Sequence, residues 1–214
     1  MNDTQAVAML NAVLRLYPNA QPTLTATTPF EILVAVMLSA QTTDVAVNAV
    51  TPKLFAAYPD AAHLAQATVA QIEPYIDRLG LYHVKAQHLQ AMSQQLDSEF
   101  GGAVPGTRAE LMALPGVGQK TATVVLTDAF GVPGIAVDTH VTRIIRGFGI
   151  VGPTATPTQI QAKLEALMPE DTWINLHRAL IRLGREWLTA RHPQLPPGAD
   201  WAAFGEAYAP LKEG

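Results

Sequence analysis

Apolar residues recur at helical spacing along the whole chain, and no stretch alternates apolar and polar residues over the length of a strand. Val69, Ile72, Ile76 and Leu79, for example, lie three or four residues apart and are followed by Gly80, a residue type that often ends a helix. The sequence therefore predicts an all-α fold. The expected helices are 29–38, one from 43 or 44, one from 60, then 68–79, 83–100, 107–113, 119–130, 139–148, 157–168 and 171–190.

The composition is that of a folded and lightly charged protein. Of the 214 residues 49% are hydrophobic, which excludes intrinsic disorder, and 15% are charged, against about 25% in an average domain. The net charge of −4 argues against a generally basic nucleic-acid binder. Arg178, Arg182 and Arg185 nevertheless share one helix face. That stripe is either a solvated face or a DNA-facing one.

Targeting and metal-binding signals are missing from the sequence. The N-terminus lacks a basic and then apolar signal peptide, and the longest apolar stretch, 32–40, is too short to span a bilayer. We therefore expect a cytoplasmic protein. The six histidines have no metal-ligand spacing, and the absence of cysteine excludes disulfides and thiolate-held clusters. After Arg191, the proline-rich segment 192–198 leads to a short amphipathic tail.

The most informative segment is the turn from Leu114 to Gly118, which joins two short helices. Gly116 and Gly118 permit a tight turn and a close approach of another backbone. The helix that follows presents free N–H groups and the positive end of its dipole, which together suit a phosphate. An ordinary turn between two helices is the alternative. Two other glycine motifs are excluded, because a P-loop needs Gly where Gln119 stands and a dinucleotide fingerprint needs Gly where Thr121 stands.

Lys120 and Asp138 are candidate catalytic residues. Lys120 lies in the first turn of the helix after the glycines, where the helix dipole and partial burial would favour the neutral amine. A neutral amine can attack an aldehyde-level carbon and form a Schiff base. Asp138 precedes the helix expected at 139–148, so it is either a functional carboxylate or simply the cap of that helix.

Four segments together resemble one family. LPGVGQKTATVVL at 114–126 and AVDTHVTRIIRGFGI at 136–150 are similar to the helix-hairpin-helix and Gly/Pro…Asp (HhH-GPD) signature of endonuclease III-type DNA glycosylases. SAQTTDVAVN at 39–48 and GLYHVKAQHL at 80–89 also resemble this family, in the expected order. The resemblance extends over residues 28–191, and agreement of several ordered motifs is much more specific than one motif.

The resemblance implies a bifunctional DNA glycosylase and abasic-site lyase that acts on oxidised pyrimidines in double-stranded DNA. Lys120 takes the position of the nucleophile that attacks C1′, and Asp138 that of the assisting carboxylate. Gln41 matches the residue that fills the gap left by the flipped nucleotide, and Leu81 the apolar wedge beside the orphaned base. Without the family context, Gln41 could be a capping amide and Leu81 a core residue.

The implied fold has two all-α lobes with DNA in the cleft between them. A six-helix lobe spans 22–132, and 1–21 and 133–214 form the second lobe. The protein is expected to act as a monomer. The further residues expected to contact DNA are Gly116, Gly118, Thr121, His140 and Arg143; for His140, local bonding at the helix start is an equal alternative.

The resemblance also concerns two inorganic groups. Similar hairpins hold a sodium or potassium ion through main-chain carbonyls, here those of Met112, Leu114 and Val117. Most family members carry a [4Fe–4S] cluster on four cysteines, and this chain has none. No cofactor is therefore expected to be required. The four matching positions hold Leu188, Leu195, Gly198 and Phe204; we expect Leu188, Leu195, Trp201 and Phe204 to form an apolar plug that replaces the cluster.

Three other functions stay open at this point. A glycosylase of the same fold with another lesion preference, such as a purine-directed relative, would keep every one of these motifs. A non-catalytic helix-hairpin-helix module would keep the glycines without needing both Lys120 and Asp138. A helical enzyme acting on small molecules would leave the hairpin, Gln41 and Leu81 unexplained.

Overall fold

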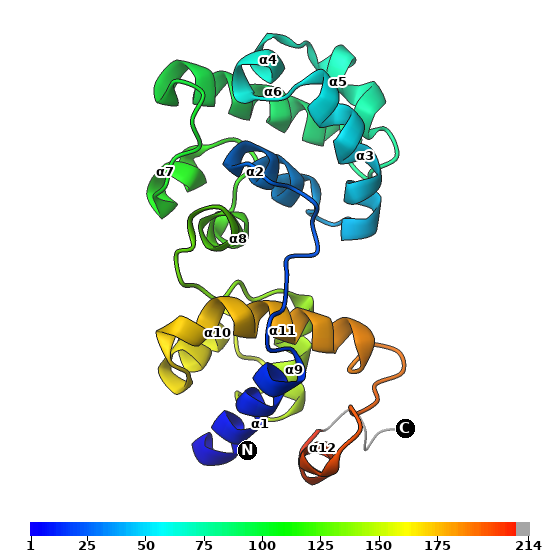
Figure 1. Cartoon of the computed structure of the whole chain (residues 1–214), viewed down its shortest axis with the longest axis vertical. Coiled ribbons are helices and arrows are strands. Elements are labelled where there is room, and N and C mark those ends of the chain that lie inside the picture. Colours follow the sequence, from blue (N-terminus) through cyan, green and yellow to red (C-terminus); the bar gives the residue numbers. More distant parts are fainter. Residues whose placement is uncertain (209–214) are drawn as a thin grey trace. The chain divides into compact units, whose positions relative to one another are not determined.

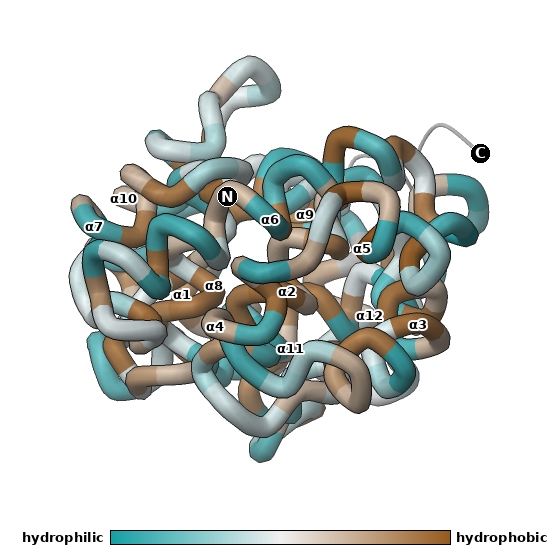
Figure 2. The backbone as a smooth tube through the Cα atoms, turned by 90° about the horizontal axis from the view of Figure 1, so that it is seen from above, coloured by the Kyte–Doolittle hydropathy of each residue, from teal (hydrophilic) through white to brown (hydrophobic). Residues whose placement is uncertain are grey.

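The computed structural model describes residues 1–208, and within them every regular element is a helix apart from one isolated bridge between Leu188 and Pro193 (Figure 1). The expected all-α fold is thus confirmed. By its internal contacts the chain divides into a central unit, Pro22–Val132, and a terminal unit that combines Met1–Gln21 with the chain from Pro133 onward. Hydrophobic and hydrophilic residues follow one another along the helices, as amphipathic helices require (Figure 2).

The central unit contains seven helices, which match the seven expected between residues 22 and 132 from the helical spacing, whereas the resemblance implies a six-helix lobe. The short α4 is a separate element, because Asp60 caps its start and α5 begins directly after Thr68. Contacts between elements place α8 against α2, and α6 against α4 and α5. The seven helices are α2 (Pro29–Leu38), α3 (Asp44–Ala57), α4 (Ala61–Gln66), α5 (Val69–Ile76), α6 (Tyr82–Phe100), α7 (Arg108–Ala113) and α8 (Gln119–Phe130).

The most buried helix of the central unit is α2. Pro29 occupies its first position, and Thr28 and Glu31 form a reciprocal capping box, so its start is strongly determined by sequence. Seven of its ten residues are buried. A helix that is apolar on all sides lies inside a core, and α2 accordingly supports both α8 and the turn that joins α7 to α8.

The terminal unit is built around the packing of α9 on α11. The two helices approach closely at Gly184, where an added Cβ would lie 2.8 Å from the Cβ of His140. Asn175 ties α11 to the chain after α1, since its Oδ1 accepts from the Ala20 N–H and its Nδ2 donates to the Tyr17 carbonyl. The elements are α1 (Asp3–Leu16), α9 (Thr139–Gly147), α10 (Pro157–Leu167), η1 (Glu170–Thr172), α11 (Trp173–Glu186) and α12 (Ala199–Gly205).

Helix α11 is shorter than the 171–190 expected from sequence. Its first residues form the 3-10 turn η1, and it ends at Glu186. Arg143 explains the end, because its guanidinium donates to the carbonyls of Gly184 and Leu188 and so binds the last turn and the chain that leaves it. Leu188 then pairs with Pro193 in the isolated bridge instead of continuing the helix.

The chain after α11 packs on α9 through aromatic side chains. Leu188 and Trp201 are buried as expected, whereas Leu195 and Phe204 are only partly buried. The largest fully buried side chain among residues 1–208 is that of Tyr208, which the sequence did not single out. Its ring packs against that of Phe148, with the centroids 4.6 Å apart and the ring planes tilted by 50°. Tyr208 therefore adds a fully buried ring to a cluster that the sequence expected Leu188, Leu195, Trp201 and Phe204 to form.

Candidate active site

The hairpin turn depends on Gly116. This residue has a φ of +79°, in the left-handed region that glycine adopts without strain. An added Cβ would lie 3.0 Å from both the His88 side chain and the Met37 sulfur. Backbone conformation and packing against α2 and α6 thus both require glycine here.

The second glycine of the turn faces open space. Gly118 is the N-cap of α8 and is exposed, and a Cβ added to it would have no atom within 4 Å beyond the glycine and its two chain neighbours. No side chain caps the N–H groups of the first turn of α8, and the half-buried Thr121 lies in that turn. The helix start is therefore open to an external anion, as the sequence predicts for a phosphate.

The two helices of the hairpin are clamped together beneath this open end. The Arg108 guanidinium on α7 donates to the Thr123 hydroxyl on α8 over 2.6 Å, and that hydroxyl donates to the Gln119 carbonyl. Leu111 and Ala122 are fully buried in the core of the central unit. The turn is consequently held on a rigid base, which favours a fixed geometry for the N–H groups above it.

Lys120 is the second residue of α8, as expected, but it is exposed and not partly buried. The sequence predicts that both the helix dipole and partial burial act on this amine. Of these two, only the position at the helix N-terminus is present. Exposure leaves the amine accessible to a substrate.

Asp138 is the N-cap of α9. Its Oδ1 accepts the Val141 N–H over 2.8 Å, so the capping alternative is confirmed. The half-buried carboxylate has a second oxygen that this bond does not use. Lys120 belongs to the central unit and Asp138 to the terminal unit.

His140 and Arg143 are largely occupied within the terminal unit. Burial lowers the pKa of His140, and the nearby Arg143 cation acts in the same direction while Asp138 opposes it. At neutral pH His140 thus offers a neutral imidazole to a phosphate and not a positive charge. Arg143 binds the end of α11 and lies 3.3 Å from His140 Nδ1. Contact of either side chain with DNA stays a prediction.

Gln41 and Leu81 have the same unusual backbone conformation. Within residues 1–208 they are the two non-glycine residues with positive φ, 54° and 61° respectively. Both side chains are exposed, and Leu81 is 58% exposed. A left-handed non-glycine residue costs about 1–2 kcal/mol, and such strain gathers at functional sites. The core alternative for Leu81 is wrong, because an exposed strained leucine contributes little to packing.

The carbonyls expected to hold a monovalent cation lie on the hairpin. That of Leu114 accepts the Val117 N–H over 3.1 Å, which uses one of its two lone pairs. Met112 is exposed at the end of α7. Among residues 1–208 no group of three or more His, Asp or Glu side chains could hold a metal ion. The cation site stays a prediction.

The arginine stripe on α11 is partly engaged in the terminal unit. Arg182 donates to Glu186 over 2.9 Å, and its guanidinium lies 4.6 Å from the centre of the Tyr17 ring. Arg178 and Arg185 also have interactions within the protein. For Arg182 the local pairing therefore accounts for its position without DNA.

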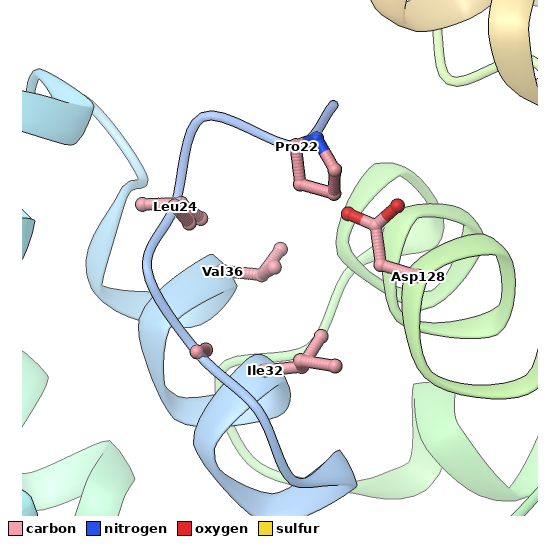
Figure 3. A pocket seen from close by; sticks show the side chains of 6 residues that line it. Pro22, Leu24, Ile32, Val36 and Asp128 are labelled. Carbon is pink, nitrogen blue, oxygen red and sulfur yellow. The ribbon is translucent and has the colours of Figure 1, made fainter. Parts of the chain in front are cut away.

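A small pocket in the central unit contains none of the predicted site residues. Its walls are apolar except for the carboxylate of Asp128 on α8 (Figure 3). Leu24 and Pro22 close it from the segment before α2, and Ile32 and Val36 from α2 itself. Since the hairpin turn, Gln41 and Leu81 do not line it, this pocket is not the candidate site.

The chain is similar to known proteins over most of its length. The model of the HhH-GPD superfamily of base-excision DNA repair proteins matches residues 34–170. Endonuclease III of Bacillus subtilis is 39% identical over 91% of this chain and 89% of its own length, and that of Synechocystis is 42% identical over 88% and 86%. The chain belongs to the HhH-GPD superfamily. None of its helices within residues 1–208 combines the length and hydrophobicity that a membrane span needs.

Solved structures of this superfamily agree with that assignment. A trapped covalent intermediate of endonuclease III with DNA has a TM-score of 0.93 at 36% identity and covers 100% of this chain and 98% of its own. A non-covalent endonuclease III–DNA complex gives the same TM-score, with 99% of each chain covered. A thermostable thymine-DNA glycosylase, at 19% identity and a TM-score of 0.84, shares the fold.

The iron–sulfur cluster implied by the resemblance does not fit this chain. The sequence contains no cysteine, and the four matching positions hold Leu188, Leu195, Gly198 and Phe204. Leu188 is fully buried, and no thiolate is available to bind iron. No step of the proposed chemistry involves the cluster.

Proposed function

We propose that this HhH-GPD protein is a base-excision DNA glycosylase with abasic-site lyase activity on oxidised pyrimidines, with Lys120 as its nucleophile. The similarity to endonuclease III over nine-tenths of the chain carries the proposal. One of the similar solved structures is a trapped covalent intermediate of endonuclease III with DNA. An exposed lysine in the first turn after the hairpin supports the same chemistry here.

The chemistry assigns one bond-forming step to Lys120. Its neutral amine attacks C1′ of the damaged nucleotide, the bond from C1′ to the base breaks, and the base leaves with a proton. The sugar ring opens to an iminium ion, which acidifies the C2′ protons. Loss of one C2′ proton then expels the 3′ phosphate and nicks the strand, and water releases the amine.

Asp138 serves the same steps as a carboxylate. It accepts a proton from Lys120 and balances the positive charge that develops on the sugar. Because Oδ1 already accepts the Val141 N–H, we assign the reaction to Oδ2. Capping and catalysis are compatible, since the cap fixes the orientation of the carboxylate.

The central unit supplies the proposed contacts with the duplex. The uncapped N–H groups at the start of α8, between Gly118 and Thr121, bind a backbone phosphate, and Gly116 shapes the turn before them. Gln41 enters the gap left by the flipped nucleotide, and Leu81 stacks beside the orphaned base. The protein is proposed to work in the cytoplasm, as a monomer and without an iron–sulfur cluster.

The decisive experiment is a panel of duplexes with defined lesions. Incubation with an oxidised pyrimidine should give both base release and a strand nick, also in the presence of an iron chelator. Oxidised or alkylated purines should be poorer substrates. Base release from purines alone would identify a relative with another lesion preference, and binding without any base release or nick would identify a non-catalytic DNA-binding module.

Two substitutions of Gln41 separate its side chain from its backbone. Gln41→Ala and Gln41→Gly both lose the amide, so each should slow excision of a base-paired lesion more than it slows cleavage of a preformed abasic site, because less flipping is needed there. Only alanine keeps the strain at a φ of 54°. In denaturant unfolding the glycine variant should therefore be about 1 kcal/mol more stable than the alanine variant. Equal losses on both substrates would contradict the gap-filling role.

A further inference from the structure

Lys85 is a buried lysine on the apolar face of α6. It is 5% exposed and lies in helical spacing with Leu89, Met92 and Leu96, all fully buried. That spacing is the sequence signal that could have drawn attention to it, since lysine almost never occupies a core position without a partner.

Two hydrogen bonds connect Lys85 with two separate turns of the central unit. Its ammonium Nζ donates to the Thr42 hydroxyl over 2.6 Å, and its backbone N–H donates to the Leu81 carbonyl over 3.0 Å. Thr42 directly follows Gln41 and closes the turn that contains it, because its N–H donates to the Ser39 carbonyl. The bond to Leu81 is the first main-chain bond of α6 and does not depend on the side chain at position 85, so it is the Lys85 ammonium that ties the start of α6, and Leu81 with it, to the turn of Gln41.

The energetics argue that Lys85 is not present for stability. A buried ammonium loses its hydration, and burial lowers the pKa of Lys85 accordingly. It recovers one side-chain hydrogen bond among residues 1–208, to Thr42, although an ammonium has three donors. A methionine would fill the same space on the apolar face without that cost. The benefit of the lysine must therefore lie in the geometry of the turns.

We propose that Lys85 is a positioning residue that holds the Gln41 turn and the Leu81 turn in one fixed arrangement, so that both side chains enter the DNA duplex together. The proposal rests on the proposed function of the protein. Lys85 itself touches neither the lesion nor Lys120; it acts through Thr42 and the backbone of Leu81.

The first test compares excision with stability in the full-length protein. Lys85→Met should lower the single-turnover rate of base release from a paired oxidised pyrimidine by roughly tenfold or more, as expected for loss of a charged hydrogen bond. Cleavage of a preformed abasic site should change by less than about threefold. The melting temperature should stay the same or rise. Lys53→Met, at an exposed lysine of α3, controls for the lost charge and should match the wild type.

The second test removes the partner of the ammonium. Thr42→Val leaves a buried charge without an acceptor, so it should lose excision and also melt lower. Adding Lys85→Met to Thr42→Val should restore the melting temperature without restoring excision. Thr42→Ser keeps the hydroxyl and should retain the excision that Thr42→Val loses.

The outcomes distinguish this inference from the function on which it rests. A wild-type protein that releases no base overturns both. If the wild type is active, unchanged excision by Lys85→Met overturns the positioning role alone. A lower melting temperature of Lys85→Met, with equal losses on paired and abasic substrates, would make Lys85 a structural residue and would also overturn it.

Discussion

Lys120→Gln should not be trapped by borohydride on a duplex with an abasic site, whereas the wild-type protein should form a covalent cross-link. Glutamine is similar in length but has no nucleophilic amine, so no Schiff base can form. Both base release and strand nicking should fall by about 10³-fold or more, as is typical when a nucleophile is removed. Gel separation of the trapped complex and single-turnover kinetics measure the two effects.

Two further variants control this experiment. Lys53→Gln removes a lysine from the exposed surface of α3 in the same unit and should be trapped like the wild type. Asp138→Asn keeps a good helix cap but cannot accept a proton. It should therefore bind DNA and melt like the wild type while losing most of its turnover. Equal trapping of Lys120→Gln would move the nucleophile elsewhere, for instance to the N-terminal amine.

The elements of the fold that the sequence could predict are those with local signals. The start of α2 follows from Thr28, Pro29 and Glu31, which determine a cap without any distant contact. The helix at 171–190 was predicted too long, because its end is set by Arg143, a residue far away in the sequence. The spacing of apolar residues shows which face of a helix is buried. It does not show which side chain, distant in the sequence, binds the last turn and ends the helix.

The candidate site, like the fold, could be predicted from the sequence only where local motifs or the family resemblance indicated its residues. The hairpin, Lys120 and Asp138 have local motifs, and Gln41 and Leu81 became visible through family resemblance. Their shared positive φ is a property of turns that neither residue type favours, so no local rule indicates it. Lys85 was missed because its role arises from a contact between residues 42 and 85. The partial burial expected for Lys120 is absent, because a helix N-terminus does not by itself determine burial.

Tyr208→Ala should give the largest loss of stability in the terminal unit. Tyr208 is completely buried, and its ring fills a notch at Gly147, where an added Cβ would lie 2.5 Å from the ring. Removing a large aromatic side chain from a core costs about 3–5 kcal/mol. For a protein of this size each kcal/mol lowers the melting temperature by roughly 2–4 °C, so a fall of about 10 °C is expected in a thermal scan.

Three variants test whether this loss of stability comes from packing in the place of the missing cluster. The buried Tyr208 hydroxyl has no hydrogen bond of normal geometry among residues 1–208 but lies close to the Arg143 guanidinium, so Tyr208→Phe should cost much less stability than Tyr208→Ala. Phe204→Ala should cost less, because Phe204 is only partly buried. Gly147→Ala should destabilise the wild type but add little to Tyr208→Ala, since the clash involves that ring. If Gly147→Ala and Tyr208→Ala lowered the melting temperature additively, the Tyr208 ring would not occupy the notch at Gly147. The apolar replacement of the cluster would then have to rest on Leu188 and Trp201.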